Sequence, residues 1–322
     1  WSAIQTSLNR YDGELKGFDP DKVPDKPLVH LANHVLIADR KDFKVKQAYL
    51  DAVLRWFSTE IEQVGVDSMK ENLDAWASRN TAGLIPNSGI KVTQDTRLVV
   101  QNALLFAAQW DSPFTAESTH QEDFTLAGGK TVKADLMHDT RSIPHATGKG
   151  WAAVRLAYAS GEDGRDSDLA LDVVLPDAGT LPGAMDAGTW AEASKALDSA
   201  RKRDVELALP KLDLTSHPKE LLDFLKEQGL NTDGLDKIAP GLGLTQVVQQ
   251  VRLILDEEGT VAAALSEAAA AEMAAPVEQQ TKPVKFTVDH PYVLRLRDLT
   301  SGTALLEAAI MDPTVKEIGD PA

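Results

Sequence analysis

The chain has 322 residues, with 33 Lys or Arg against 49 Asp or Glu and a formal net charge of -16. Apolar residues make up 43% and charged residues 25%, which is typical of a globular protein and excludes a disordered, collagen-like or coiled-coil chain. The negative charge argues against nucleic acid and against anionic membranes as partners, because both attract surfaces dense in Lys and Arg.

The first half of the chain combines strand-like runs with amphipathic helices. Residues 28–38 predict a strand, and residues 49–64 predict a helix because apolar side chains recur there at helical spacing. A second helix is expected to be capped by Asp67 or Ser68. Residues 96–110 form a long apolar run with a β-branched entry, which predicts a central strand buried on both faces.

The second half is richer in strands. Residues 124–134 predict a hairpin, because Gly128 and Gly129 supply the positive φ of a tight turn. Further strands are expected at 169–177, 205–214, 245–256, 285–298 and 302–311, and helices at 186–203 and 221–230. Strands and helices come in blocks without regular alternation, so the order favours an α+β fold with large antiparallel sheets.

Sequence signatures of common catalytic chemistry are absent. The chain has no Cys, and it contains no GxSxG, HExxH or GxxxxGK[ST] pattern. The seven His show no paired metal-ligand spacing, and His30 and His34 are interpreted as structural. The acidic run at 162–168 lacks the bidentate Glu of a calcium loop, so a solvated surface turn is the better interpretation. We therefore predict neither a metal nor a cofactor.

An Ala-rich segment toward the C-terminal end carries the most unusual pattern. Nine of the fifteen residues 261–275 are Ala. Ala has the highest helix propensity, so an Ala-rich helix is one interpretation and a flexible linker is a second. The third rests on alternation, because every second residue from Thr260 to Ala270 is small and uncharged. A strand with such a face can slide between two other strands and become buried without a clash.

The segment DEEGTVAAA at 256–264 resembles the hinge of the reactive-centre loop in serpins, a family of serine protease inhibitors. Four further stretches resemble motifs of that family in the same order. They are 72–85 (with Asn72, Trp76, Thr81, Gly83 and Ile85), 97–114 (with Asn102, Phe106, Trp110, Pro113 and Phe114), 205–214, and 288–306 (with Asp289, His290, Pro291, Tyr292 and Gly302). The chain thus resembles a prokaryotic-type serpin over most of its length.

The resemblance implies one α+β domain over residues 1–322. Its parts would be a large, mainly antiparallel central sheet, two smaller sheets, peripheral helices and an exposed reactive-centre loop at about 257–283. The implied function is suicide inhibition of an elastase-, chymotrypsin- or subtilisin-like serine protease, in which the cut loop enters the central sheet as a new strand. The alternative is a non-inhibitory serpin that acts as a carrier, a chaperone or a protease substrate.

Site residues follow from the same resemblance. The hinge consists of Glu257, Glu258, Gly259, Thr260, Val261, Ala262, Ala263 and Ala264. Asn102, Trp110 and Gln249 occupy the shutter and breach positions that an inserting loop passes, with Gln249 where the family has His. Counting along the family's loop from Glu257 places the reactive bond between Met273 and Ala274. A serine protease bound covalently is the implied partner, no cofactor is implied, and a monomer is expected.

Several positions depart from the family pattern. In the family pattern, several helices and a buried strand precede the position of Trp1. This sequence is expected to lack them. Val261 stands where the hinge usually has Glu, and it would point outward after insertion. Leu306 and Glu307 replace an apolar aromatic pair near the C-terminal end. An extracellular or secreted location is favoured by the resemblance alone.

Overall fold

The computed structural model describes residues 7–13, 15, 17–19, 22–159, 168–229, 231–260 and 282–318. The acidic run at 162–168 lies outside these residues except for Asp168. The Ala-rich segment 261–275 lies outside them entirely.

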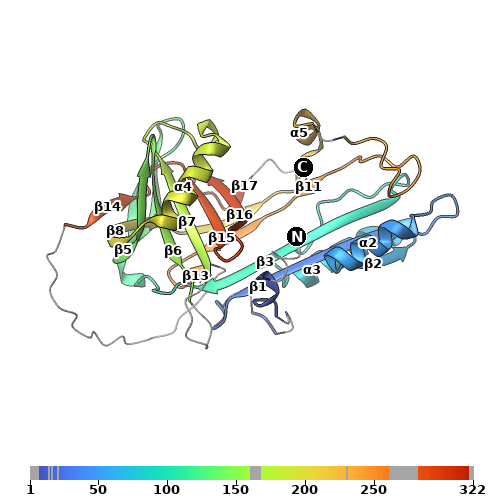
Figure 1. Ribbon diagram of the computed structural model, residues 1–322, viewed down its shortest axis with the longest axis horizontal. Coiled ribbons are helices and arrows are strands. Elements are labelled where there is room, and N and C mark those ends of the chain that lie inside the picture. The colour runs from blue at the N-terminus through green and yellow to red at the C-terminus, as the bar shows by residue number, and fades with distance from the viewer. Residues whose placement is uncertain are drawn as a thin grey trace.

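A seven-stranded sheet runs along the long axis of the molecule (Figure 1). Its order is β17 (Glu317–Ile318), β9 (Leu212–Ser216), β12 (Arg252–Leu255), β13 (Gly259–Thr260), β3 (Leu98–Gln109), β1 (Leu28–Ala38) and β2 (Glu60–Val64). The pairs at the two edges, β17 with β9 and β1 with β2, are parallel, and the pairs between them are antiparallel. The predicted large, mainly antiparallel sheet is therefore confirmed.

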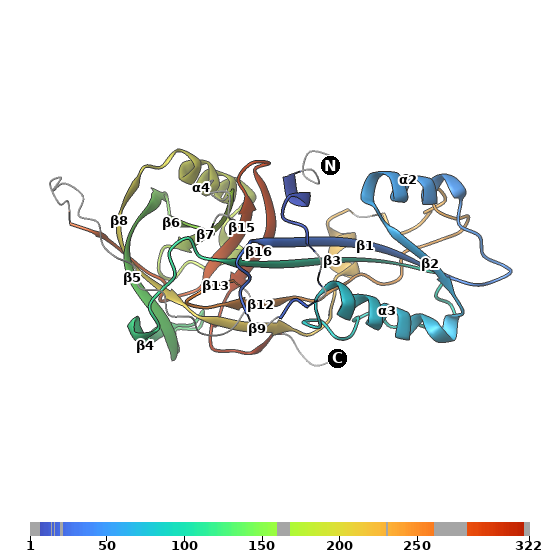
Figure 2. The same ribbon diagram turned by 90° about the horizontal axis from the view of Figure 1, so that it is seen from below.

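A second sheet of eight strands gathers at one end of the molecule (Figure 2). Its order is β14 (Val284–Thr287), β8 (Lys202–Pro210), β5 (Thr131–Gly148), β6 (Trp151–Ala157), β7 (Leu169–Pro176), β15 (Tyr292–Asp298) and β16 (Thr303–Ile310), and β4 (Thr119–Thr125) pairs with β5. The long strand β5 pairs with β4 through its first part, with β8 through its middle and with β6 through its last residues, so it joins two layers. A short sheet of β10 (Lys219–Glu220) and β11 (Val248–Gln249) completes the fold.

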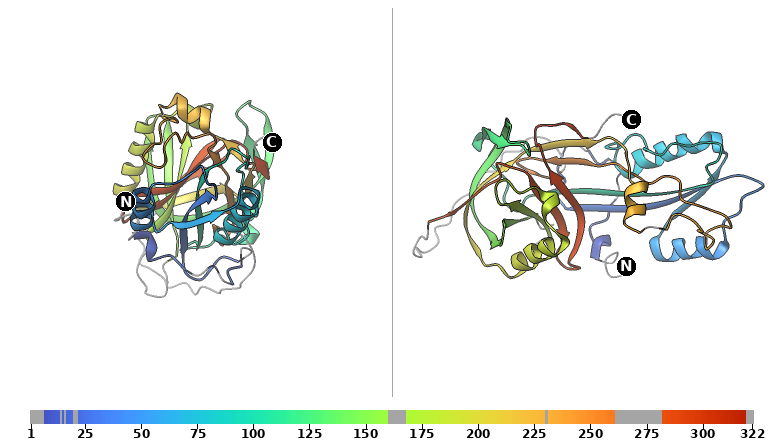
Figure 3. Two further views of the ribbon diagram at one scale, coloured as in Figure 1. Left: turned by 90° about the vertical axis from the view of Figure 1, so that its right-hand side faces the viewer. Right: turned by 90° about the horizontal axis from the view of Figure 1, so that it is seen from above.

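The described helices lie at the periphery of the sheets. They include α2 (Gln47–Phe57), α3 (Val66–Asn80), α4 (Ala187–Ser199) and α5 (Leu222–Glu227), with 3-10 turns at Ala116–Ser118 and Pro182–Ala184. Figure 3 shows α2 and α3 on opposite sides of one end of the central sheet, away from the eight-stranded sheet. No helix of the described residues is long and apolar enough to cross a membrane.

Two predictions about the helices were wrong in detail. The helix expected at 49–64 ends at Phe57, because Ser58 adopts a left-handed conformation and residues 60–64 then pair with β1 as a strand. The helix α3 has Gly65 at its N-cap position and no side-chain cap there. Asp67 lies in its first turn instead, where a carboxylate still interacts favourably with the helix dipole.

The predicted central strand β3 is buried on both faces only in its second half. Leu105 to Ala108 are buried, whereas the side chain of Val100 is 57% exposed. Val99 is covered by α3 and its neighbours, but among the described residues the opposite face of this end has no comparable cover. The strands expected at 205–214, 245–256 and 285–298 are each interrupted into two shorter strands.

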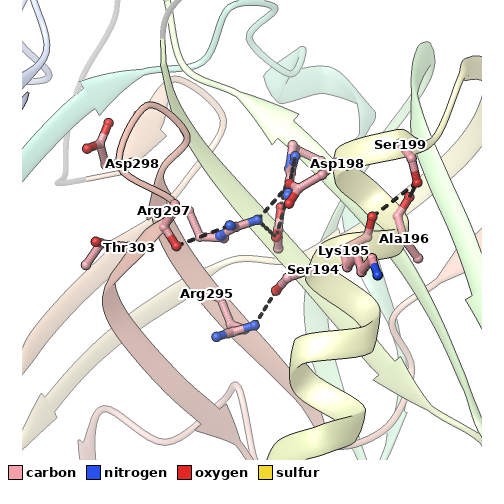
Figure 4. Close-up of polar contacts among 12 residues, drawn as sticks. Ser194, Lys195, Ala196, Asp198, Ser199, Arg295, Arg297, Asp298 and Thr303 are labelled. Carbon is pink, nitrogen blue, oxygen red and sulfur yellow. Dashed lines mark hydrogen bonds and ion pairs between the residues drawn. The ribbon is translucent and has the colours of Figure 1, made fainter.

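An ion network attaches α4 to the eight-stranded sheet (Figure 4). Arg297 of β15 donates to Asp198 of α4 over 2.9 Å, and Arg155 of β6 forms an ion pair with the same carboxylate at 2.8 Å. Arg295, the neighbour on the same face of β15, donates to Ser194 of α4 and to Glu307 of β16. Glu307 thus has a cross-strand partner, which explains a charged residue where the family has an apolar one.

Candidate functional site

A tight acidic turn connects β12 to β13 at the end of the central sheet. The backbone N–H of Asp256 donates to the carbonyl of Gly259 over 3.0 Å. The Asp256 carboxylate accepts from the backbone N–H groups of Glu258 and Gly259 at 3.0 and 3.1 Å. After this turn the chain runs between two strands of the sheet. β13 pairs with β12 on one side and with β3 on the other (Figure 2).

Gly259 is required by the close approach of β3. A Cβ atom at this position would lie 2.2 Å from the carbonyl oxygen of Ala108 and 2.9 Å from the Cα atom of Gln109. Both contacts are with backbone, which cannot move aside as a flexible side chain can. Only glycine therefore lets the hinge enter the sheet at this point.

Thr260 is already buried in the sheet, with 5% of its surface exposed. Its Oγ1 atom lies 2.7 Å from the hydroxyl oxygen of Tyr158. The Tyr158 ring stacks on Trp110 at 4.7 Å between centroids, and complete burial raises the pKa of the Tyr158 hydroxyl. Trp110 holds the turn itself, because its Nε1–H donates to the carbonyl of Asp256 over 2.9 Å.

Glu257 is anchored by two side chains from neighbouring elements. Its Oε1 atom accepts from Thr119 at 2.7 Å, and its Oε2 atom lies 2.5 Å from the Nζ atom of Lys211. Burial opposes ionisation here, but the hydrogen bonds from Lys211 and Thr119 outweigh it and hold the pKa of Glu257 below its usual value. Glu258 is the opposite case, because burial and the charges of Asp256 and Glu257 raise its pKa.

A cavity of about 1020 Å³ continues from Thr260 along the sheet. One wall consists of residues 98–106 of β3, and the facing wall consists of residues 244–255, which end in β12. β3 pairs with β1 along its far edge over residues 98–107. On the edge toward the cavity, its only strand partner among the described residues is β13, which pairs with Ala108 and Gln109. The sheet is thus open where another strand would fit.

The predicted shutter and breach residues occupy different parts of this region. Trp110 lies beneath the acidic turn, as described above, while Asn102 and Gln249 line the cavity from opposite walls. The amide of Asn102 donates to Ala32 and Asn33 of β1 at 3.1 and 3.0 Å. Gln249 belongs to β11 and pairs with Lys219 of β10, whereas the Asn102 amide is bound to β1.

The remaining predicted residues lie outside the described part of the chain. They are the hinge residues Val261, Ala262, Ala263 and Ala264 and the reactive-bond residues Met273 and Ala274. The sequence analysis in turn missed Tyr158, Thr119 and the role of Lys211. Their contacts with the hinge join residues between 46 and 138 positions apart, so no local pattern signals them.

Comparisons with known proteins agree with this geometry. The family model described as serpin (serine protease inhibitor) matches residues 3–313, and the chain belongs to this family. A serpin-like protein of Thermococcus kodakarensis is 29% identical over 287 residues, which are 85% of this chain and 64% of that protein. The chain therefore spans somewhat less than two thirds of this archaeal relative.

The names of similar proteins describe both protease inhibitors and a ligand-binding protein. Plasminogen activator inhibitor 1 of Sus scrofa is 26% identical over 295 residues, covering 85% of this chain and 70% of that protein. The crystal structure of human thyroxine-binding globulin in complex with a ligand matches with a TM-score of 0.75 at 20% identity, covering 97% of this chain and 79% of that one. The structural likeness establishes the shared fold.

Proposed function

We propose that the chain is a suicide inhibitor of a serine-type endopeptidase, acting as a monomer. The observation that carries the proposal is the position of Thr260, which pairs with Ala108 of β3 and Leu255 of β12 at the end of an open cavity. Thr260 of the hinge thus already stands where an inserted strand would begin. Insertion then extends the existing pairing of β13 with β3 and β12, so no new strand pairing has to be initiated.

The face presented by the hinge supports the same proposal. Thr260 directs its side chain into the protein, toward Tyr158. Successive residues of a strand alternate between faces, so continued insertion would place Ala262, Ala264, Ser266, Ala268 and Ala270 on the same face as Thr260. All five are small and uncharged, and burying them carries no penalty for an unpaired charge.

The reaction begins with ordinary protease chemistry. The serine Oγ of the protease attacks the carbonyl carbon of Met273, the bond to the nitrogen of Ala274 breaks, and the freed amine takes up a proton from the catalytic His. The new carboxyl end stays bonded to the serine as an acyl-enzyme. Insertion of the cut loop then draws the protease along the sheet and distorts its active site before water can deacylate it. The inhibitor is consumed in the process, so it is not an enzyme.

A gel experiment tests the proposal. The chain is mixed with elastase-, chymotrypsin-, subtilisin- and trypsin-like proteases at equal molarity and separated under denaturing conditions. We expect a covalent band at the summed mass with at least one of the first three. A carrier or other non-inhibitory serpin would instead give cleaved chain with fully active protease across the panel, and this result would contradict the proposal.

A further inference from the structure

Two histidines and a glutamate converge on one face of the hairpin formed by β4 and β5. His120 and Glu122 are two positions apart on β4, so they share a face. The register pairs His120 with Leu136, which places His138 of β5 diagonally across from His120 on that same face. The hairpin turn at Gly128 and Gly129 fixes this register (Figure 2).

The ligand atoms of the three side chains lie close together. The Nε2 atom of His120 lies 3.1 Å from Glu122 Oε1, and the Nε2 atom of His138 lies 3.3 Å from the same oxygen. The two imidazole rings are stacked with centroids 4.1 Å apart and an angle of 7° between their planes. One ligand atom from each residue lies within 4.8 Å of the other two.

His138 is the most informative of the three residues. Its Nε2 atom is closed off from solvent and makes no well-aligned hydrogen bond to any described residue, although Glu122 lies close to it. A buried ring nitrogen normally has a hydrogen-bond partner, so this one needs an explanation.

The spacing of the ligand atoms fits a transition metal. Ligands about 2.0–2.1 Å from a tetrahedral Zn²⁺ ion lie about 3.3 Å from one another. The two distances to Glu122 Oε1 already have this value within 0.2 Å, and rotation of the exposed His120 ring adjusts the third. Two nitrogen ligands disfavour Ca²⁺ and Mg²⁺, which prefer oxygen.

We infer that His120, Glu122 and His138 form a binding site for a divalent transition metal ion, with Zn²⁺ as the best fit. Three protein ligands leave at least one coordination position for water or for a side chain of a partner. Among the described residues β4 has no strand neighbour besides β5, so the ion would also tie this edge strand to the sheet. The alternative is a plain surface cluster in which two imidazoles share one carboxylate without a metal.

Titration of the metal-free full chain with ZnCl₂ separates these interpretations. Isothermal calorimetry is run on the EDTA-treated, dialysed protein and on His120→Ala and Glu122→Gln, neither of which removes a core side chain. Gln121→Ala changes an exposed side chain on the opposite face of β4, and His217→Ala removes a distant His paired with Glu317. Both variants serve as matched controls.

We expect one Zn²⁺ ion per chain in the unmodified protein and in both controls. His120→Ala and Glu122→Gln should bind zinc at least about tenfold more weakly, since even outer-shell partners of a metal change its affinity by about 10–100-fold. X-ray absorption of the zinc complex should show a nitrogen and oxygen shell with imidazole scattering at about 2.0–2.1 Å. Absence of stoichiometric binding, or equal affinity in the two ligand variants and the controls, would overturn the inference.

Discussion

The hydroxyl groups of Tyr158 and Thr260 lie 2.7 Å apart inside the protein, joining the eight-stranded sheet to the hinge of the reactive-centre loop. Tyr158 comes directly after β6, and its backbone N–H donates to the carbonyl of Leu169 in β7, so contacts outside the hinge also hold it in place. At this contact Thr260 stands between β3 and β12. Under the proposed mechanism, the residues that follow it would continue this strand in the cut protein.

A charge at Thr260 should convert the inhibitor into a substrate. Thr260→Arg would place a guanidinium in the buried site beside the Tyr158 ring, and burying a charge costs several kcal/mol. Insertion would lag behind deacylation, and the protease would escape. The measurement is the number of inhibitor molecules consumed per protease inactivated, which should rise several-fold. Thr260→Ser, which keeps the hydroxyl, is the control, and an unchanged value in the Arg variant would count against the proposal.

Two of the three acidic residues of the turn, Glu257 and Glu258, should respond to pH in opposite directions. The pKa of Glu257 is lowered in the folded state, so its stabilising contribution is present at neutral pH and is lost as pH falls below about 4.5. Glu257→Gln should therefore cost about 2 kcal/mol at pH 7 and progressively less in acid. The measurement is the free energy of unfolding in urea at pH 7 and pH 4.

Glu258 provides the matched comparison. Its pKa is raised, so the ionised form is penalised in the folded state and the penalty appears as pH rises through that pKa. Glu258→Gln should leave stability unchanged in acid and increase it at pH 7. If the two variants shift the free energy of unfolding with the same sign at pH 7, the described roles of Lys211 and Thr119 at Glu257 are wrong.

The register of β13 predicts the partners of Ser266 after insertion. Extending its pairing with β3 and β12 by six residues places Ser266 opposite Asn102 on one side and Gln249 on the other. These are the two residues that the family resemblance assigns to the shutter. Ser266→Ala should therefore destabilise the cleaved chain by about 1 kcal/mol and leave the intact chain unchanged.

The control for this prediction is Glu267→Ala, because residue 267 would face the opposite side of the inserted strand. Thermal unfolding of intact and cleaved chains gives both values. If Ser266→Ala lowers the stability of the intact form as much as that of the cleaved form, the extended register is incorrect.

The reactive bond is predicted between Met273 and Ala274. The long, unbranched and apolar Met side chain suits the primary pockets of elastase-, chymotrypsin- and subtilisin-like proteases. In a trypsin-like pocket it would leave a buried Asp without a partner, so trypsin should be inhibited poorly. Mass spectrometry of the small fragment released by an elastase-like protease should show Ala274 at its N-terminus. A fragment beginning beyond Lys282 would contradict both the register and the class of target.

Local patterns in the sequence predicted where most helices and strands lie, but they could not predict the tertiary contacts between these elements. Gly128 and Gly129 predicted the hairpin correctly, and the small residues after Thr260 pointed to a strand that can insert. The helix at 49–64 was overextended, because its last residues owe their strand conformation to pairing with β1, a tertiary contact that helical spacing cannot reveal.

The metal ligands illustrate the same limit. His120 and His138 are eighteen positions apart, and no usual spacing links them. The predicted hairpin contained the missing information, because its turn sets the register that brings both rings to one face. Likewise, Gly259 matched the hinge motif in the sequence, but only the position of the Ala108 carbonyl explains why glycine is needed there.

Hydrogen exchange along β3 tests the central claim most directly. The chain is cut at the reactive-centre loop, and exchange of peptides covering residues 98–107 is followed by mass spectrometry in the intact and the cut protein. Insertion between β3 and β12 would give the open edge of β3 a strand partner, so protection of these peptides should rise by at least about tenfold while peptides from β7 stay unchanged. Equal exchange of residues 98–107 before and after the cut would show that the loop does not enter the sheet.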